Sequence, residues 1–75
     1  MSLHYNINIF WSQEDGCWIA DVPDLRGCSA HGETPEEAAR EAQLAMELWM
    51  ETAQAHGDTI PVPRYRAAIY AAKAA

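Results

Sequence analysis

Five side chains that commonly bind metals or act as nucleophiles are spread along this 75-residue sequence: His4, Cys17, Cys28, His31 and His56. A structural zinc site takes pairs of ligands from short segments such as Cys-x2-Cys or His-x3-His, and neither spacing occurs here. Cys28 and His31 are three residues apart, but side chains at that spacing in a strand point to opposite faces. We therefore expect no metal ligands and no cofactor-binding residues.

Nucleophilic catalysis needs a serine or cysteine beside a base that a third group orients. Ser29 and His31 would share a strand face, yet the sequence supplies neither a third member nor an oxyanion site. Three acids surround the same segment and would have to converge on Mg²⁺ to act as a nuclease centre; they are Asp21, Asp24 and Glu33. Solvated loop acids are the simpler interpretation. We expect no catalytic residues and no enzyme activity.

Charge is distributed unevenly along the chain, whose formal net charge is −6. Residues 1–58 hold eleven acids and two arginines, a charge of −9, and residues 59–75 hold three bases and no acid, a charge of +3. An acidic body would repel a nucleic-acid duplex. The side chains that could contact phosphates or stack on bases are Arg64, Arg66 and Lys73 with Tyr65 and Tyr70. Residues 64–75 are nevertheless too few for a helix-turn-helix or a ribbon-type binder. We expect no direct nucleic-acid binding. Residues 64–75 should instead form a solvated arm or an arm docked on an acidic neighbour.

A chain of this length forms one domain with a small core. No run of 18 apolar residues could span a membrane, no signal peptide is visible, and two cysteines are too few for a disulfide scaffold. We expect a cytoplasmic protein with a core domain over residues 1–63 and a short basic arm over residues 64–75.

Period-two alternation predicts two strands, over residues 5–11 and 17–22. The first places Tyr5, Ile7, Ile9 and Trp11 on one face, and the second places Trp18, Ala20 and Val22 on one face. Pairing Trp11 with Trp18 and Ile9 with Ala20 brings these faces together. The alternative, Trp11 with Cys17, would turn Asp21 toward the core.

A corner follows at residues 23–27, because Pro23 removes a backbone donor and Gly27 permits a positive φ. Residues 28–32 then read as a third strand, antiparallel to the second. Cys28 would lie near Val22 and too far from Cys17 for a disulfide.

Thr34 to Glu37 has the pattern of a capping box, in which Thr34 accepts from the Glu37 amide and Glu37 reaches back to the Thr34 amide. The helix is expected to end near His56, with Gly57 as its stop. The stripe predicted to pack on the sheet is Ala38, Ala42, Ala45, Met46, Trp49 and Ala53, with His56 on the same side. The predicted solvated face is Arg40, Gln43, Glu47, Glu51 and Gln54.

Leu44, Leu48 and Ala55 fit neither face and form a second apolar strip along the helix. One small sheet cannot easily cover two stripes, so we predict a helix–helix contact in a homo-oligomer, either a dimer or a tetramer. The alternative is that the C-terminal segment of the same chain covers the strip. Residues 60–63 should be extended, since residues before proline avoid the helical region, and residues 64–70 could form a final strand or an arm.

These motifs, in this order, resemble the HicB-like antitoxin family. The resemblance rests on Asp21-Val-Pro-Asp-Leu-Arg-Gly-Cys28, Gly32-Glu-Thr-Pro-Glu-Glu-Ala38 and Ile60-Pro-Val-Pro63. The residues that we assign to the fold motif are Pro23, Gly27, Cys28, Gly32, Thr34, Glu37, Pro61 and Pro63. The resemblance implies an α+β domain of order β-β-β-α-β, likened to a reduced ribonuclease-H fold. It also implies binding of a small, basic, mRNA-cleaving HicA-type toxin, whose active histidine the antitoxin covers.

Many members of the family continue into a C-terminal DNA-binding domain, whereas this sequence stops at Ala75. We therefore expect a short form without a C-terminal DNA-binding domain. The rival hypothesis is a solitary homo-oligomeric interaction module with no toxin partner.

Overall fold

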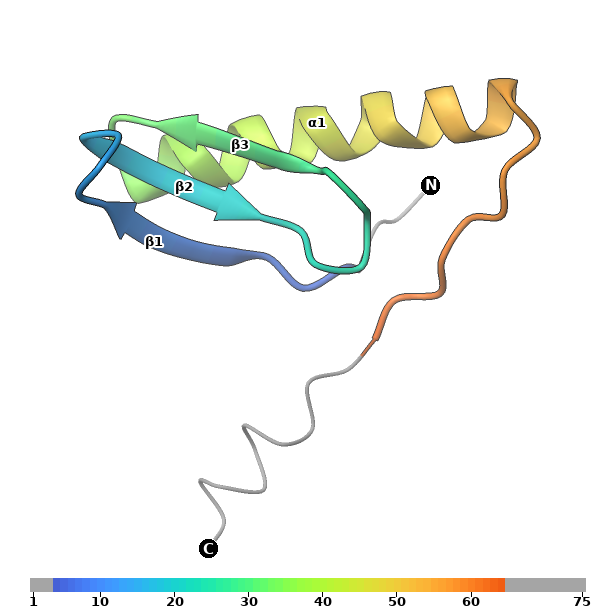
Figure 1. Ribbon diagram of the computed structural model, residues 1–75, viewed down its shortest axis with the longest axis horizontal. Coiled ribbons are helices and arrows are strands. Elements are labelled where there is room, and N and C mark those ends of the chain that lie inside the picture. The colour runs from blue at the N-terminus through green and yellow to red at the C-terminus, as the bar shows by residue number, and fades with distance from the viewer. Residues whose placement is uncertain (1–3, 65–75) are drawn as a thin grey trace, which may run out of the picture.

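The computed structural model describes residues 4–64, which fold as a three-stranded antiparallel sheet followed by one long helix (Figure 1). The elements are β1 (Asn8–Ser12), β2 (Cys17–Asp21), β3 (Ser29–Gly32) and α1 (Pro35–Ala55). The strand order is β1-β2-β3, and α1 packs mainly on β3 and β2 and least on β1. The predicted α+β fold is confirmed. A final strand or arm was expected near residues 64–70, and the part of that range beyond residue 64 lies outside the described residues.

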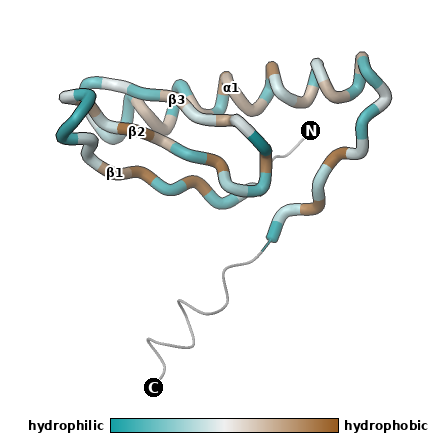
Figure 2. Tube along the Cα trace, viewed as in Figure 1, coloured by the Kyte–Doolittle hydropathy of each residue, from teal (hydrophilic) through white to brown (hydrophobic). Residues whose placement is uncertain are grey.

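The predicted register between the first two strands is confirmed. Trp11 lies opposite Trp18, and Ile9 lies opposite Ala20. The two indoles pack edge to face, with ring centroids 5.6 Å apart and planes at 70°. Figure 2 shows hydrophobic residues interrupted by hydrophilic ones along β1. Because successive side chains in a strand point to opposite faces, this register determines which residues of β1 and β2 face α1.

The first strand is shorter than predicted, since β1 begins at Asn8 and not at residue 5. Strand β2 ends at Asp21, and Val22 then donates its N–H to the Cys28 carbonyl at 3.0 Å. Pro23, which follows, has no N–H to offer to a neighbouring strand. Tyr5 is nevertheless buried in the core, so the segment before β1 contributes packing without sheet pairing.

The corner between β2 and β3 is held by its own backbone. Leu25 donates to the Val22 carbonyl at 3.1 Å, Cys28 donates to the Leu25 carbonyl at 3.0 Å, and Gly27 has a φ of 74°. Leu25 is 1% exposed, so the corner inserts a large apolar side chain into the core. Cys28 immediately precedes β3, and both cysteines are free thiols.

The predicted capping box is half correct. The Thr34 hydroxyl accepts a hydrogen bond from the Glu37 N–H at 3.0 Å, as expected. The Glu37 carboxylate, however, accepts from the N–H of Glu33 at 3.0 Å and not from that of Thr34. The carboxylate reaches one residue further back, because the chain leaves β3 and enters the helix with Thr34 in an extended conformation.

The other end of α1 matches the predicted stop. Gly57 has a φ of 70°, and the Asp58 N–H donates to the Ala53 carbonyl at 2.8 Å, which closes the last turn. His56 caps the helix but is exposed, so its predicted place on the packed side is wrong.

The core lies between α1 and the sheet. The buried helix residues are Ala38, Ala42, Met46, Met50 and Ala53. Met50 was missing from the predicted stripe, whereas Ala45 and Trp49 are only half-buried at its border. The Trp49 ring lies at the edge of the sheet, where its indole N–H donates to the Arg26 carbonyl at 2.9 Å. The predicted solvated face is exposed at all five positions.

After the helix, the chain returns to its own beginning. The Tyr5 hydroxyl donates to the Pro61 carbonyl, and the Asn6 side-chain amide donates to the Arg64 carbonyl at 2.8 Å. The Arg64 N–H donates to the Asp24 carboxylate at 2.9 Å. Figure 1 shows this closing segment running from the end of α1 toward β1. Among the described residues, no helix is both long and apolar enough to cross a membrane.

Candidate protein-interaction surface

The side chains that could have carried chemistry are separated in the structure. Within residues 4–64, no three His, Cys, Asp or Glu side chains are grouped closely enough to hold a metal ion. Asp21 lies opposite Ser29 on the sheet, and Asp24 accepts a hydrogen bond in the corner. Glu33 follows the far end of β3, so the three acids of the predicted hairpin lie in different places.

Cys28 is the most deeply buried of the candidate nucleophiles. Burial raises the pKa of its thiol, and the nearby Asp21 carboxylate raises it further. A raised pKa favours the neutral thiol, which is the weaker nucleophile. His31 lies on an exposed position of β3, and the strand alternation places it on the opposite face from Cys28.

The residues assigned to the fold motif lie at the joints of the domain. The β2–β3 corner holds Pro23, Gly27 and Cys28. The junction of β3 and α1 holds Gly32, Thr34 and Glu37, and the closing segment holds Pro61 and Pro63. Gly27 and Cys28 line one pocket and Gly32 and Glu37 line another, so the corner and the β3–α1 junction border different hollows. They shape the domain, and the surfaces between the joints remain as candidate binding sites.

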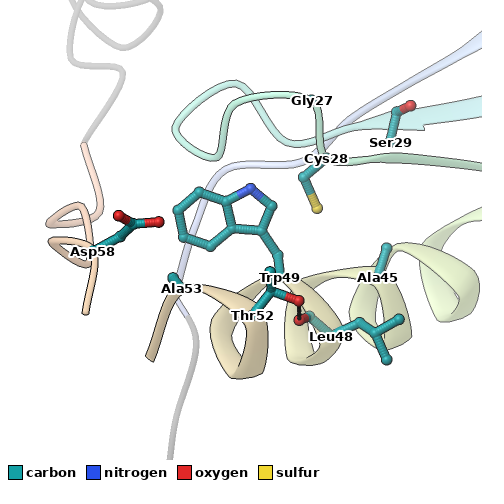
Figure 3. Close-up of a pocket in the computed structure, with 9 residues that line it drawn as sticks. All are labelled: Gly27, Cys28, Ser29, Ala45, Leu48, Trp49, Thr52, Ala53 and Asp58. Carbon is teal, nitrogen blue, oxygen red and sulfur yellow. Dashed lines mark hydrogen bonds between the residues drawn. The ribbon is translucent and has the colours of Figure 1, made fainter. Parts of the chain in front are cut away.

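The first such surface is the helix strip of Leu44, Leu48 and Ala55. Leu44 is 54% exposed, Leu48 is 65% exposed and Ala55 is exposed as well, so none of the described residues covers the strip. It borders a shallow pocket of about 360 Å³ between α1 and the start of β3. Figure 3 shows the Trp49 indole against the Gly27–Cys28 corner, with Leu48 at the rim of this pocket.

The second surface is the face of the sheet that α1 does not cover, and sequence reasoning missed it. Phe10 lies opposite Ile19, and Ile19 lies opposite His31, so these three side chains form one row across all three strands. Phe10 is 48% exposed and Ile19 is half-buried. A signal was present in the sequence, because Phe10 and Ile19 are apolar residues at the positions where the alternation should have been polar.

The surroundings of this row are acidic. Asp21 lies in the neighbouring row, opposite Asn8 and Ser29. At the other end of the sheet, a hollow of about 740 Å³ is lined by Ile19 and His31 together with the carboxylates of Asp15, Glu33 and Glu37. No lysine or arginine lines this hollow. The uncovered face therefore combines an apolar centre with a negatively charged border.

Comparison with known proteins adds a family to this geometry. Residues 5–74 match the family model described as the HicB-like antitoxin of bacterial toxin-antitoxin systems. The chain is 42% identical over 59 residues to the UPF0150 protein ssl0259 of Synechocystis, covering 79% of this chain and 80% of that protein. It is 34% identical over 53 residues to the UPF0150 protein Ta0767 of Thermoplasma acidophilum, covering 71% and 77%. A second Synechocystis protein, ssr1765, is 36% identical over 58 residues, covering 76% and 73%. No solved structure matches the chain.

Proposed function

The chain belongs to the HicB-like antitoxin family of bacterial toxin–antitoxin systems, and from this premise we propose that it binds and neutralises a small mRNA-cleaving toxin of the HicA type. In this proposal the antitoxin acts by covering the active site of the toxin. In the same proposal the antitoxin performs no chemistry itself.

The observation that carries the proposal is the family match, which runs through the β2–β3 corner, the start of α1 and the closing segment. We assign toxin binding to a core domain over residues 1–63, and we regard residues 64–75 as a short basic arm. The match extends to residue 74, so the arm belongs to the same family pattern.

Charge gives independent support for a basic partner. All eleven acids of the chain lie within residues 4–64, against three arginines, which gives that part a charge of −8. A protein that binds and cleaves RNA needs positive charge on its surface. Opposite charges on two partners raise the rate of encounter and favour the correct partner over others.

Two measurements test the proposal. The first is co-expression with the toxin-like protein encoded beside this one, for which we expect a stable complex and recovery of growth. The second is RNA cleavage by the purified toxin, which one equivalent of this protein should suppress. The absence of both complex and rescue would overturn the proposal.

A second candidate function is a homo-oligomeric interaction module without a toxin partner. The exposure of Leu44 and Leu48 favours it, because neighbouring exposed leucines on one helix flank are typical of an association surface. A genome in which no toxin-like gene lies beside this one, together with a stable oligomer in solution, would favour this second function over the first.

A further inference from the structure

We propose that the uncovered face of the sheet, with Phe10 and Ile19 at its centre, is the surface on which a basic protein partner docks. This inference rests on the proposed function and deepens it by assigning toxin binding to one surface. It concerns the row formed by Phe10, Ile19 and His31 and the acidic groups around that row.

The apolar centre is unusual for a face that no element of the described chain covers. An antiparallel sheet packed on one side normally alternates, with apolar residues toward the core and polar residues toward water. The rows on either side follow this rule, since Ser12 lies opposite Cys17 and Asn8 lies opposite Asp21. The row between them instead places an aromatic ring beside an isoleucine.

This arrangement has the anatomy of a protein interface. Interfaces commonly have an apolar and aromatic centre surrounded by polar and charged groups, and a few central residues contribute most of the binding energy. Phe10 suits the central position, because nearly half of its surface is exposed and it is not a member of the core cluster. Its exposed ring is therefore available to a partner.

Charge decides which kind of partner fits. Asp21 flanks the row on one side, and Glu33 and Asp15 line the hollow at the end of the sheet. A second copy of the chain stacked on this face would bring its own acidic side chains against those of the first copy, and repulsion between like charges makes that contact unfavourable. A partner that presents an apolar side chain surrounded by lysine or arginine would satisfy both the centre and the border.

The experiment compares two pairs of substitutions on different surfaces. The sheet variant, Phe10→Thr with Ile19→Thr, removes the apolar centre while keeping residues that favour strands. The comparison variant, Leu44→Gln with Leu48→Gln, removes two exposed leucines from the helix strip, the rival candidate surface. The control is Val62→Thr, at an exposed apolar residue outside both surfaces. The probe is the toxin encoded beside this protein, with its active histidine changed to alanine, and the measurement is the Kd by calorimetry.

We expect the sheet variant to bind at least about tenfold more weakly and the control to stay within about threefold of the unchanged protein. An unchanged Kd for the sheet variant, with wild-type protein binding normally, would overturn this inference and leave the proposed function standing. A large loss in the helix-strip variant alone would also overturn it, in favour of the helix strip. If the wild-type protein binds no toxin, the proposed function fails and this inference fails with it.

A second measurement needs no substitution in the face and so does not depend on the folding of a variant. Cys17 is half-exposed on β2, two residues before Ile19 and on the same face, whereas Cys28 is buried. Reaction of Cys17 with iodoacetamide should slow by at least about fivefold when saturating toxin covers the face. Equal rates of reaction with and without bound toxin would contradict the assignment of this surface.

Discussion

Gly32 lies so close to the first turn of α1 that a β-carbon at this position would meet the backbone nitrogen of Ala38 at 2.6 Å. The backbone carbon of Glu37 would lie 2.9 Å away. Gly32 does not have a positive φ, so glycine is needed here for close packing and not for a turn. This contact sets the distance between β3 and α1, and α1 in turn determines which face of the sheet is covered.

Gly32→Ala should therefore lower the free energy of unfolding by about 1–3 kcal/mol, because backbone atoms must move to admit the new methyl group. The measurement is urea denaturation followed by circular dichroism. Ser29→Ala, on an exposed position of the same strand, is the matched control and should change stability little. Equal stability of the two variants would show that the junction can relax.

Removing the N-terminal cap of α1 should lower the free energy of unfolding by less than Gly32→Ala does. Thr34→Ala removes the hydroxyl that accepts the Glu37 N–H, and we expect a loss of about 1 kcal/mol in the free energy of unfolding. Thr34→Ser keeps the hydroxyl and should retain most of the stability. If the serine variant is as unstable as the alanine variant, the methyl group of Thr34 and not its hydroxyl stabilises this end.

The sequence allowed the register of β1 and β2, the corner and the limits of α1 to be predicted, because each depends on local patterns: alternation, proline and glycine positions, and caps. The hydrogen bond of Trp49 could not be predicted this way, because its indole N–H donates to the Arg26 carbonyl, 23 residues away in the sequence, and the two groups meet only in the folded domain. The pairing of Phe10 with Ile19 follows from the same register, but the exposure of this row depends on which face of the sheet α1 covers, and that is a tertiary contact which local patterns do not determine.

Trp49→Phe tests the link between α1 and the β2–β3 corner. The variant keeps an aromatic ring but loses the N–H that donates to the Arg26 carbonyl, and we expect a loss of about 0.5–1.5 kcal/mol of stability. Trp11→Phe is the control, because the Trp11 indole N–H donates to the exposed side chain of Gln13, at 3.2 Å. A larger loss in the Trp11 variant would contradict the assigned role of Trp49.

The raised pKa of Cys28 predicts a dependence of stability on alkaline pH. Below the ordinary thiol pKa, Cys28 is neutral in both the folded and unfolded states, so the stability that the buried thiol contributes is fully present. Above that pH the unfolded thiol loses its proton while the buried thiol keeps it, so stability falls as pH rises. The midpoint of urea denaturation should therefore decrease between about pH 8 and about pH 10.

Cys28→Ala should flatten this decrease. Part of the decrease will remain in the Cys28 variant, because burial and the Asp24 charge also raise the pKa of Tyr5, with the same sign of effect at higher pH. An identical pH profile for the Cys28 variant and the unchanged protein would show that the thiol contributes nothing to the alkaline loss.

The helix strip gives a prediction about assembly. Leu44→Glu with Leu48→Glu should yield a monomer by light scattering while the helical circular dichroism is retained, because both side chains are already exposed. Gln43→Glu with Gln54→Glu adds the same charge to the solvated face and serves as the control. An unchanged mass for the leucine variant would mean that the chain does not associate through this strip.

The hydrogen bonds from Tyr5 to Pro61 and from Asn6 to Arg64 bring the two ends of the described chain to one corner of the domain. A short peptide linker could therefore join these ends without disturbing the fold, and new ends could be opened in the exposed turn at Glu14 and Asp15. Such a circularly permuted protein would place its termini beside the hollow that Asp15 lines together with Ile19 and His31, at the end of the uncovered sheet face.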